Sequence, residues 1–301
     1  KKGFVFLKTT AQHTSRPAVF IKGEEQLIGN KTKIFKNQRT PDVIKISATD
    51  GSKFMATILY PDNYNKKKKY PASIFLHGGS RRQMLRTYHY SGYYSNAFAV
   101  QQYFASQGYI AMMINYRSGI GYGTEFREAN NYGITGASEV YDLIGAGEYL
   151  ASRSDIDPSR IAIWGGSYGG YLTAHGLSRR SDLFSVGVDI HGVHNWNTEL
   201  PTFASWYNPH YYPKIAALAY QSSPEAHLDG WESPVLLIHG DDDRNVPFAE
   251  SVVLSEQLRE RGVYFEQLIF PDEVHGFLLQ NNWVRCMEAT FEFIDRHIGV
   301  K

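Results

Sequence analysis

A glycine-rich pentapeptide, Gly165-Gly166-Ser167-Tyr168-Gly169, constrains the fold of this chain more than any other feature. An apolar run at 161–164 precedes it, and a run with helical character at 170–177 follows it. This order of strand, tight turn and helix predicts a bend that holds the serine hydroxyl out at the top of a sheet, at a helix N-terminus. Flanking glycines are needed because a bulky neighbour would collide with the adjacent strand and helix. We therefore interpret Ser167 as a candidate nucleophile, and an ordinary glycine-rich turn is the alternative.

The composition is that of a large globular chain. Its 301 residues suffice for one large α/β domain or two modest ones, and 43% of them are hydrophobic, enough for a sizeable core. The formal net charge of +1 argues against nucleic acid as a partner. We interpret the basic run Lys66–Lys69 as a solvated loop. No apolar stretch reaches the roughly 20 residues of a membrane span, so we expect no span.

Cysteine content and the start of the chain bear on cofactors and location. Cys286 is the only cysteine, which excludes an internal disulfide and a cysteine-based zinc cluster. No signal peptide is recognisable, but the chain opens at Lys1 without an initiator Met, and we read it as a piece of a longer protein. The compartment stays open between the cytoplasm and export, and the oligomeric state stays open as well, a homo-oligomer included. Asn30-Lys31-Thr32 matches the glycosylation triplet, a pattern that is common by chance.

Residues 1–40 differ in pattern from the rest of the chain. Two short β-type runs, Phe4–Lys8 and Ala18–Lys22, are separated by polar and turn-forming residues. They are able to pair as a hairpin, but a lone two-stranded hairpin is marginal in water. We expect this segment to dock on something, or to belong to a sheet whose other strands lie elsewhere.

Residues 41–301 alternate strands with helices. A hairpin signal at Asp50-Gly51 joins the first two strands. The predicted strands are 43–47, 54–59, 72–76, 109–114, 161–164, 186–190, 235–238 and 265–269. The predicted helices are 95–107, 137–152, 170–177, 248–261 and 282–298. Continuously apolar strands between helices predict a mostly parallel, doubly wound sheet, with functional residues on loops at the carboxyl ends of its strands.

Two of those loops carry candidate partners for the serine. His239 to Pro247, with Asp241, Asp242 and Asp243, follows one predicted strand, and Pro271 to Phe277, with His275, follows the last. A serine hydroxyl needs a base, and the base needs an orienting acid. The order Ser, Asp, His is that of the α/β-hydrolase fold. We take His275 as the base, because a base needs an open loop with a small following residue, which Gly276 provides. Any of the three aspartates is able to be the acid at this point.

Other histidines have simpler interpretations. His239 ends a strand and is interpreted as structural. His191 and His194 with Asp189 can be read as a metal cluster, but they lie at a strand end and its loop, without the usual ligand spacing. We expect neither a metal nor another cofactor.

Glycines after an early strand supply a further part of the site. His77-Gly78-Gly79-Ser80 follows the strand ending at Leu76. A tetrahedral intermediate needs preorganised donors for its oxyanion. We expect the backbone N–H of Tyr168 to be one donor and that of Gly78 or Gly79 to be the other. A plain glycine turn is the alternative.

The residues around these motifs resemble the prolyl oligopeptidase family of serine peptidases, which includes dipeptidyl and acylaminoacyl peptidases. The resemblance runs over roughly residues 43–300. It is carried by the segments 164–171, 77–79, 115–119, 240–247 and 272–276. It implies an α/β-hydrolase catalytic domain with Ser167, Asp243 and His275 as its triad, because the family pattern G-x-x-D-x-x-V places the acid between Gly240 and Val246. It also implies that Val193 to Trp196 lines the pocket for the residue before the scissile bond. Val246 matches a pocket wall, and Asn245 matches a contact near the substrate carbonyl.

Two departures limit what the resemblance implies. Family members carry a β-propeller before the hydrolase domain, and only residues 1–40 are able to belong to one here, as closing strands or a linker. The anchors for a free amino terminus would lie in that propeller, so the exopeptidase type is left open. Residues 197–213 differ from the tyrosine-rich motif of dipeptidyl peptidases, and we do not transfer its tyrosines to Tyr207 or Tyr211.

Three functions compete at this point. A peptidase cleaving short peptides through an acyl-enzyme is the first. A carboxylesterase acting on small esters is the second, because esters and amides share the tetrahedral intermediate. A non-catalytic binding module on a hydrolase scaffold is the third, and the complete set Ser167, Asp243 and His275 argues against it.

Overall fold

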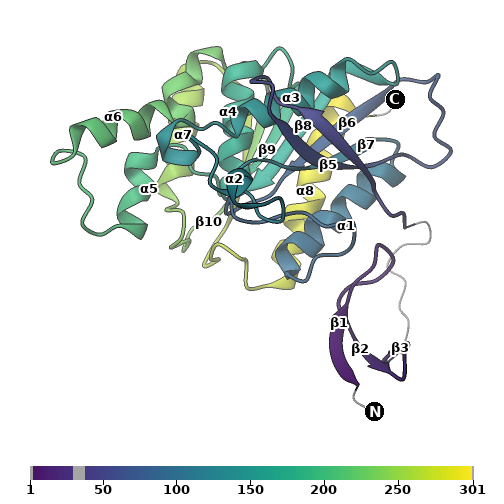
Figure 1. Ribbon diagram of the computed structural model, residues 1–301. Coiled ribbons are helices and arrows are strands. Elements are labelled where there is room, and N and C mark those ends of the chain that lie inside the picture. The colour runs from purple at the N-terminus through teal and green to yellow at the C-terminus, as the bar shows by residue number, and fades with distance from the viewer. Residues whose placement is uncertain (1–2, 30–37, 300–301) are drawn as a thin grey trace.

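A computed structural model describes residues 3–29 and 38–299. The candidate glycosylation triplet Asn30-Lys31-Thr32 lies outside the described residues. Figure 1 shows a main body built on one large sheet, and a small β-sheet that projects from it near the N-terminus.

The large sheet has eight strands in the order β11-β10-β9-β8-β6-β7-β5-β4. The strands are β4 (Asp42–Ser47), β5 (Lys53–Leu59), β6 (Tyr70–Leu76), β7 (Ile110–Asn115), β8 (Ile156–Gly166), β9 (Val186–Ile190), β10 (Val235–Gly240) and β11 (Phe265–Phe270). The six strands from β11 to β7 run parallel, whereas β5 is antiparallel to β7 and β4 is antiparallel to β5. The predicted mostly parallel sheet is therefore confirmed.

Helices cover both faces of this sheet (Figure 1). The long helices are α1 (Gly92–Ser106), α3 (Val140–Ala151), α4 (Tyr168–Arg180), α7 (Ala249–Glu260) and α8 (Gln280–Ile298). The shorter ones are α2 (Thr124–Arg127), η1 (Gly133–Thr135), α5 (Trp196–Phe203), α6 (Pro213–Gln221) and η2 (Pro224–Gly230). Sequence analysis predicted the five long helices and missed the short ones.

Two hydrophobic cores lie on opposite faces of the sheet. Side chains alternate between the faces along each strand, so Ile74 belongs to the core under α3, α4 and α7, and Phe75 to the core under α1 and α8. Both side chains are fully buried. The sheet is apolar on both faces because helices cover both, which explains the continuously apolar strands in the sequence.

The N-terminal segment forms three strands rather than the predicted two-stranded hairpin. β1 (Phe4–Lys8) pairs with β2 (Arg16–Ile21), and β2 pairs with β3 (Glu24–Leu27), all antiparallel. Sequence analysis missed the third strand because it begins with the polar residues Glu24 and Glu25. Residues after β1 contact the main body: Tyr88 N donates to Thr10 O at 3.1 Å, and the Thr9 and Thr87 hydroxyl oxygens lie 3.0 Å apart.

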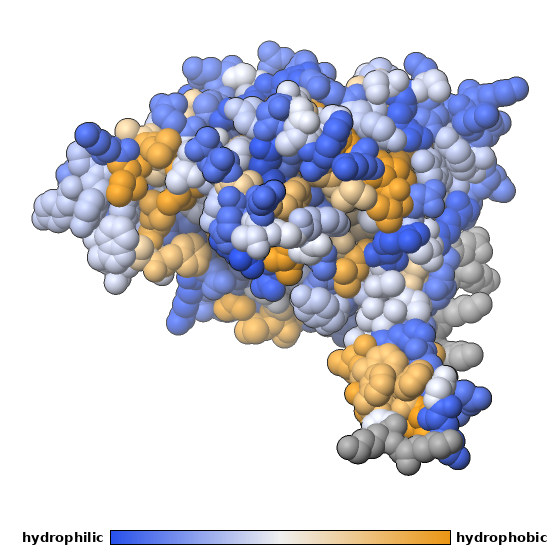
Figure 2. Space-filling model, viewed as in Figure 1, coloured by the Kyte–Doolittle hydropathy of each residue, from blue (hydrophilic) through white to orange (hydrophobic). Residues whose placement is uncertain are grey.

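This small sheet leaves large apolar side chains in solvent. Phe4, Val5 and Leu7 are each more than half exposed. Figure 2 shows the resulting apolar surface on the projecting part of the molecule. Among the described residues, no helix is long and apolar enough to cross a membrane.

Candidate active site

Ser167 lies on a sharp bend between β8 and α4. We call this bend, residues 165–169, the elbow. Its backbone has φ 59° and ψ −122°, a conformation that is costly for a residue with a side chain. Its N–H donates to Ile190 O at 2.9 Å, which ties the bend to β9. The predicted arrangement of strand, turn and helix is present.

The glycines around Ser167 are required by close backbone contacts. A Cβ on Gly165 would lie 2.4 Å from Leu76 O, and one on Gly169 would lie 2.1 Å from the same atom. Real Cβ atoms do not approach backbone oxygens so closely, so only glycine fits without a shift. A Cβ on Gly166 would meet the Tyr93 hydroxyl at 1.8 Å.

His275 and Asp243 form a hydrogen-bonded pair. His275 Nδ1 donates to Asp243 Oδ2 at 2.7 Å. The other carboxylate oxygen accepts from the backbone N–H groups of Asn245 at 2.8 Å and Val246 at 3.0 Å. Burial raises the pKa of Asp243, but hydrogen bonds from His239 and His275 outweigh burial and hold the pKa well below its ordinary range. A charged carboxylate therefore orients His275 through Nδ1, and Nε2 has no hydrogen-bond partner among the described residues.

The structure distinguishes the three consecutive aspartates. Asp241 and Asp242 are exposed, and Asp242 pairs with Arg244 on the surface. Only Asp243 of the three is buried and contacts His275.

His191 connects the serine bend to the base, a role that sequence analysis missed. Its ring lies 4.2 Å from the His275 ring, centroid to centroid, and its Nε2 is 2.8 Å from the Tyr93 hydroxyl. Burial, followed by the charges of His275 and His239, lowers the pKa of His191 well below its ordinary value. The His191 ring therefore stays neutral beside a base that must become positively charged.

Ser167 makes no hydrogen bond to His275 among the described contacts. Catalytic hydrogen bonds are often long before substrate binds and tighten in the complex. His191 nevertheless lies close to both, because a Cβ on Gly166 would be 3.2 Å from His191 Nε2 and the His191 and His275 ring centroids are 4.2 Å apart.

The expected role of Gly276 is wrong. A Cβ at this position would meet no atom within 4 Å, and its backbone is not in the left-handed region. The loop of His275 therefore does not need a small residue here.

The candidate oxyanion donors lie around the elbow. Tyr168 is the first residue of α4, and N–H groups of a first helical turn have no partner inside the helix. A Cβ on Gly78 would lie 3.2 Å from Ser167 Cβ and 3.1 Å from the Tyr94 hydroxyl, so Gly78 closely faces the bend. Gly79 adopts φ 53°, which glycine tolerates best.

The candidate substrate-contacting residues separate into two groups. Val193, Trp196 and Val246 are buried and belong to one core. The Trp196 ring contacts Tyr168, with centroids 6.0 Å apart. The Asn245 side chain is exposed, and its backbone N–H serves Asp243 instead.

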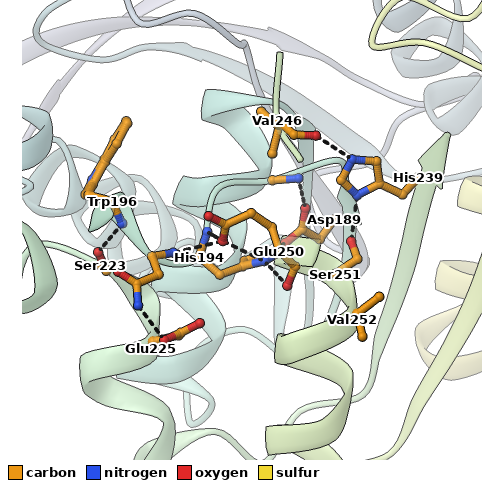
Figure 3. A network of polar contacts seen from close by, with 12 residues as sticks. Asp189, His194, Trp196, Ser223, Glu225, His239, Val246, Glu250, Ser251 and Val252 are labelled. Carbon is orange, nitrogen blue, oxygen red and sulfur yellow. Dashed lines mark hydrogen bonds and ion pairs between the residues drawn. The ribbon is translucent and has the colours of Figure 1, made fainter. Parts of the chain in front are cut away.

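A buried polar network lies behind these residues (Figure 3). His194 Nε2 donates to Asp189 Oδ2 at 2.7 Å, and Nδ1 donates to Glu250 O at 3.1 Å, so both ring nitrogens carry protons. Although burial lowers it, the charge of Asp189 and the bond to it raise the pKa of His194 to about 9. Glu250 Oε2 accepts from the backbone N–H groups of His194 and Asn195, which fixes the loop after β9.

The contacts in this network bear on whether Asp189, His191 and His194 bind a metal together. Asp189 and His194 form an ion pair, whereas His191 is directed to Tyr93. A different trio, His191, Asp243 and His275, has ligand atoms within 4.8 Å of one another. The two imidazole rings of that trio have centroids 4.2 Å apart with a 35° tilt, and His275 Nδ1 is already bonded to Asp243. We assign no metal to either group.

His239, which sequence analysis interpreted as structural, is buried near the end of β10. Its Nδ1 contacts Ser251 Oγ at 2.7 Å and its Nε2 lies 3.3 Å from Asp243 Oδ2. A groove of about 890 Å³ also borders the His275 loop, between α1 and α8. Its walls include Tyr93, Leu278 and Trp283.

Comparison with known proteins identifies relatives for this chain. Dipeptidyl-peptidase 5 of Porphyromonas endodontalis is 27% identical over 260 residues, covering 83% of this chain and 36% of the relative. Human dipeptidyl peptidase 8 is 31% identical over 272 residues, covering 86% of this chain and 29% of the relative. The solved acylaminoacyl peptidase of Pyrococcus horikoshii superposes with a TM-score of 0.80 at 25% identity, covering 97% of this chain and 47% of that chain. The chain thus spans less than half the length of these relatives.

The sheet order, the helices on both faces and the serine bend define an α/β-hydrolase. The profile of the prolyl oligopeptidase family matches residues 95–301. The chain belongs to the prolyl oligopeptidase family, a family of serine peptidases.

Proposed function

We propose that this chain is the catalytic part of a serine peptidase that hydrolyses short peptides through an acyl-enzyme. The observation that carries the proposal is the His275–Asp243 pair beside a strained serine bend. The names of the relatives favour dipeptidyl or acylaminoacyl peptides as substrates.

The proposed reaction has two stages, formation of the acyl-enzyme and its hydrolysis, and the same triad residues act in both. Ser167 Oγ attacks the scissile carbonyl while His275 Nε2 takes its proton, and Asp243 stabilises the resulting imidazolium. The N–H groups of Tyr168 and of Gly78 or Gly79 hold the oxyanion. His275 then gives the proton to the leaving amine, and a water molecule releases the acyl group by the same steps.

Replacing the nucleophile tests this proposal directly. We expect Ser167→Ala in the intact protein to reduce kcat on dipeptidyl and N-acyl-aminoacyl anilides by roughly 10⁴-fold or more. Ser106→Ala, at an exposed end of α1, is the control and should keep full activity. Turnover by Ser167→Ala at the wild-type rate would refute the proposal.

A carboxylesterase acting on small esters is the second candidate function. Nothing in the triad separates the two, because both reactions pass through the same oxyanion. Comparing a p-nitrophenyl ester with the anilides separates them. Rapid ester turnover with no anilide cleavage by the intact protein would favour the esterase, and failure to label Ser167 with a fluorophosphonate would favour a non-catalytic binding module.

We propose a domain boundary near residue 40, with a β segment before it and the catalytic domain at 41–301. Its support is that β4, the first strand of the large sheet, begins at Asp42. The resemblance implies that the earlier segment joins a β-propeller. Limited proteolysis should yield a resistant fragment beginning near residue 41, and equally fast cleavage throughout 41–301 would contradict the boundary.

A further inference from the structure

The inward face of α5 lies against the serine bend. Trp196 and Glu199 are the buried residues of this helix, and their spacing of three places them on one face. The Trp196 ring contacts Tyr168 and Tyr171, with centroids 6.0 and 5.2 Å apart. Glu199 is therefore one helical turn from a ring that touches the residue next to the nucleophile.

The carboxyl group of Glu199 is buried without adequate partners. The side chain is 0% exposed, Thr202 Oγ1 donates to Oε1 at 3.3 Å, and Oε2 has no hydrogen-bond partner among the described residues. Leaving a buried acceptor unsatisfied costs about 1–3 kcal/mol. Burial, then the charges of Glu250 and Asp243, raise the pKa of Glu199 to about 8.

Two further buried polar atoms, one on α5 and one on α7, are also unsatisfied. Glu250 Oε1 and Trp196 Nε1 are buried and have no partner among the described residues. Figure 3 shows Glu250 bonded to His194, and Trp196 bonded through its backbone N–H to Ser223. Buried polar groups are rarely left unpaired in native proteins, so unpaired ones in one place require an explanation. Two of the three unpaired atoms are carboxyl oxygens, which in their ionised form accept hydrogen bonds and pair with a cation.

The charged groups around Glu199 indicate that a group pairing with its carboxylate should be positively charged. Glu199, Glu250 and Asp243 are all acids, and no lysine or arginine is among the groups that act on Glu199. The nearby cation, His194, is already committed to Asp189 and to Glu250 O. A positively charged side chain would satisfy the carboxyl oxygens and offset the repulsion among them.

We propose that Glu199 determines specificity and that the enzyme prefers Lys or Arg as the residue immediately before the scissile bond. This inference rests on the proposed peptidase function. The aliphatic stem of such a residue suits the apolar side chains of Val193, Trp196 and Val246, and its charged end reaches Glu199. An apolar residue would leave the carboxyl oxygens unpaired, and an acidic one would add a further negative charge. Glu199 is shielded from solvent in the substrate-free chain, so entry of the cation requires local side-chain movement.

Substrates that differ only in this residue test the inference. The panel is one series of N-acyl and dipeptidyl anilides carrying Lys, Arg, norleucine, Gln or Glu before the anilide. Norleucine matches the lysine stem without its charge. We expect kcat/KM for Lys to exceed that for norleucine at least about tenfold in the intact protein.

Three variants test whether the preference for Lys depends on the Glu199 carboxylate. Glu199→Gln and Glu199→Leu should lose the preference for Lys, so that the ratio of kcat/KM for the Lys substrate to that for the norleucine substrate falls to about one. Glu256→Gln removes an exposed carboxylate from α7 and should keep the preference. Circular dichroism establishes that each variant is folded.

The outcomes separate the two proposals. Ser167-dependent cleavage without a preference for Lys or Arg, or a preference that survives Glu199→Gln, would overturn the inference and leave the peptidase function intact. No Ser167-dependent turnover of any substrate would overturn both.

Discussion

His275 is oriented by the carboxylate of Asp243, which is itself held by contacts with other groups of the protein. Asp243 receives two backbone N–H groups and lies 3.3 Å from His239 Nε2, so it has no freedom to leave the imidazole. The neutral ring of His191 packs against the His275 ring, with centroids 4.2 Å apart. Orientation of the base is therefore built from residues of β9, β10 and the loops that follow them.

Asp243→Asn should reduce kcat by about 10⁴-fold while leaving the fold intact, because an amide stabilises the wrong tautomer of His275. Steady-state kinetics on the best anilide gives the measurement. Asp242→Asn is the matched control, since Asp242 faces solvent beside Arg244. A larger loss in the control than in Asp243→Asn would show that the acid has been misassigned.

At the scale of elements, the elbow is defined by how closely α4 and β8 approach β6. Gly165 and Gly169 both face Leu76 O, so the strand and the helix contact one carbonyl of the neighbouring strand. This approach sets the height of Ser167 above the sheet.

Gly169→Ala should destabilise the protein by roughly 1–3 kcal/mol, the usual cost of overpacking, because its Cβ would lie 2.1 Å from a backbone oxygen. Chemical denaturation measures the change in the free energy of unfolding, and peptidase activity should fall with it. Gly92→Ala, where a Cβ meets nothing within 4 Å, should be neutral. Equal effects of the two substitutions would argue against a tight elbow.

Local sequence patterns predicted the elements but not their contacts. The elbow was predictable because strand, bend and helix are contiguous in the chain. The contact between Tyr93 and His191 was not, because the two residues are 98 positions apart and neither stands in a recognisable motif. Glu199 was missed for another reason: glutamates are almost never fully buried, so a glutamate in a short helix is expected on the surface.

At the scale of the whole molecule, buried acids and His194 link stability to pH. Burial raises the pKa of Glu250 to about 7 and that of Glu199 to about 8, and Asp189 helps raise that of His194 to about 9. Each value lies above the ordinary one. The stabilisation from each group is therefore complete below its ordinary pKa and is lost as the pH rises through the raised pKa.

Glu199→Gln should thus gain stability relative to the wild type as the pH rises from 4.5 to about 8. The gain has an upper limit of about 1.4 kcal/mol for each pH unit. Urea denaturation of both proteins at pH 5, 7 and 9 measures it, and Glu256→Gln, which changes an exposed residue, should track the wild type. A constant difference between wild type and Glu199→Gln across this range would show that Glu199 titrates normally.

The central claim is that one hydroxyl on the elbow is activated by His275. Labelling with a fluorophosphonate, followed by peptide mapping, tests this claim most directly in the intact protein. We expect a single modified residue, Ser167, and labelling slowed by several orders of magnitude in His275→Ala. Modification of a different serine, or equally fast labelling of Ser167 without His275, would contradict it.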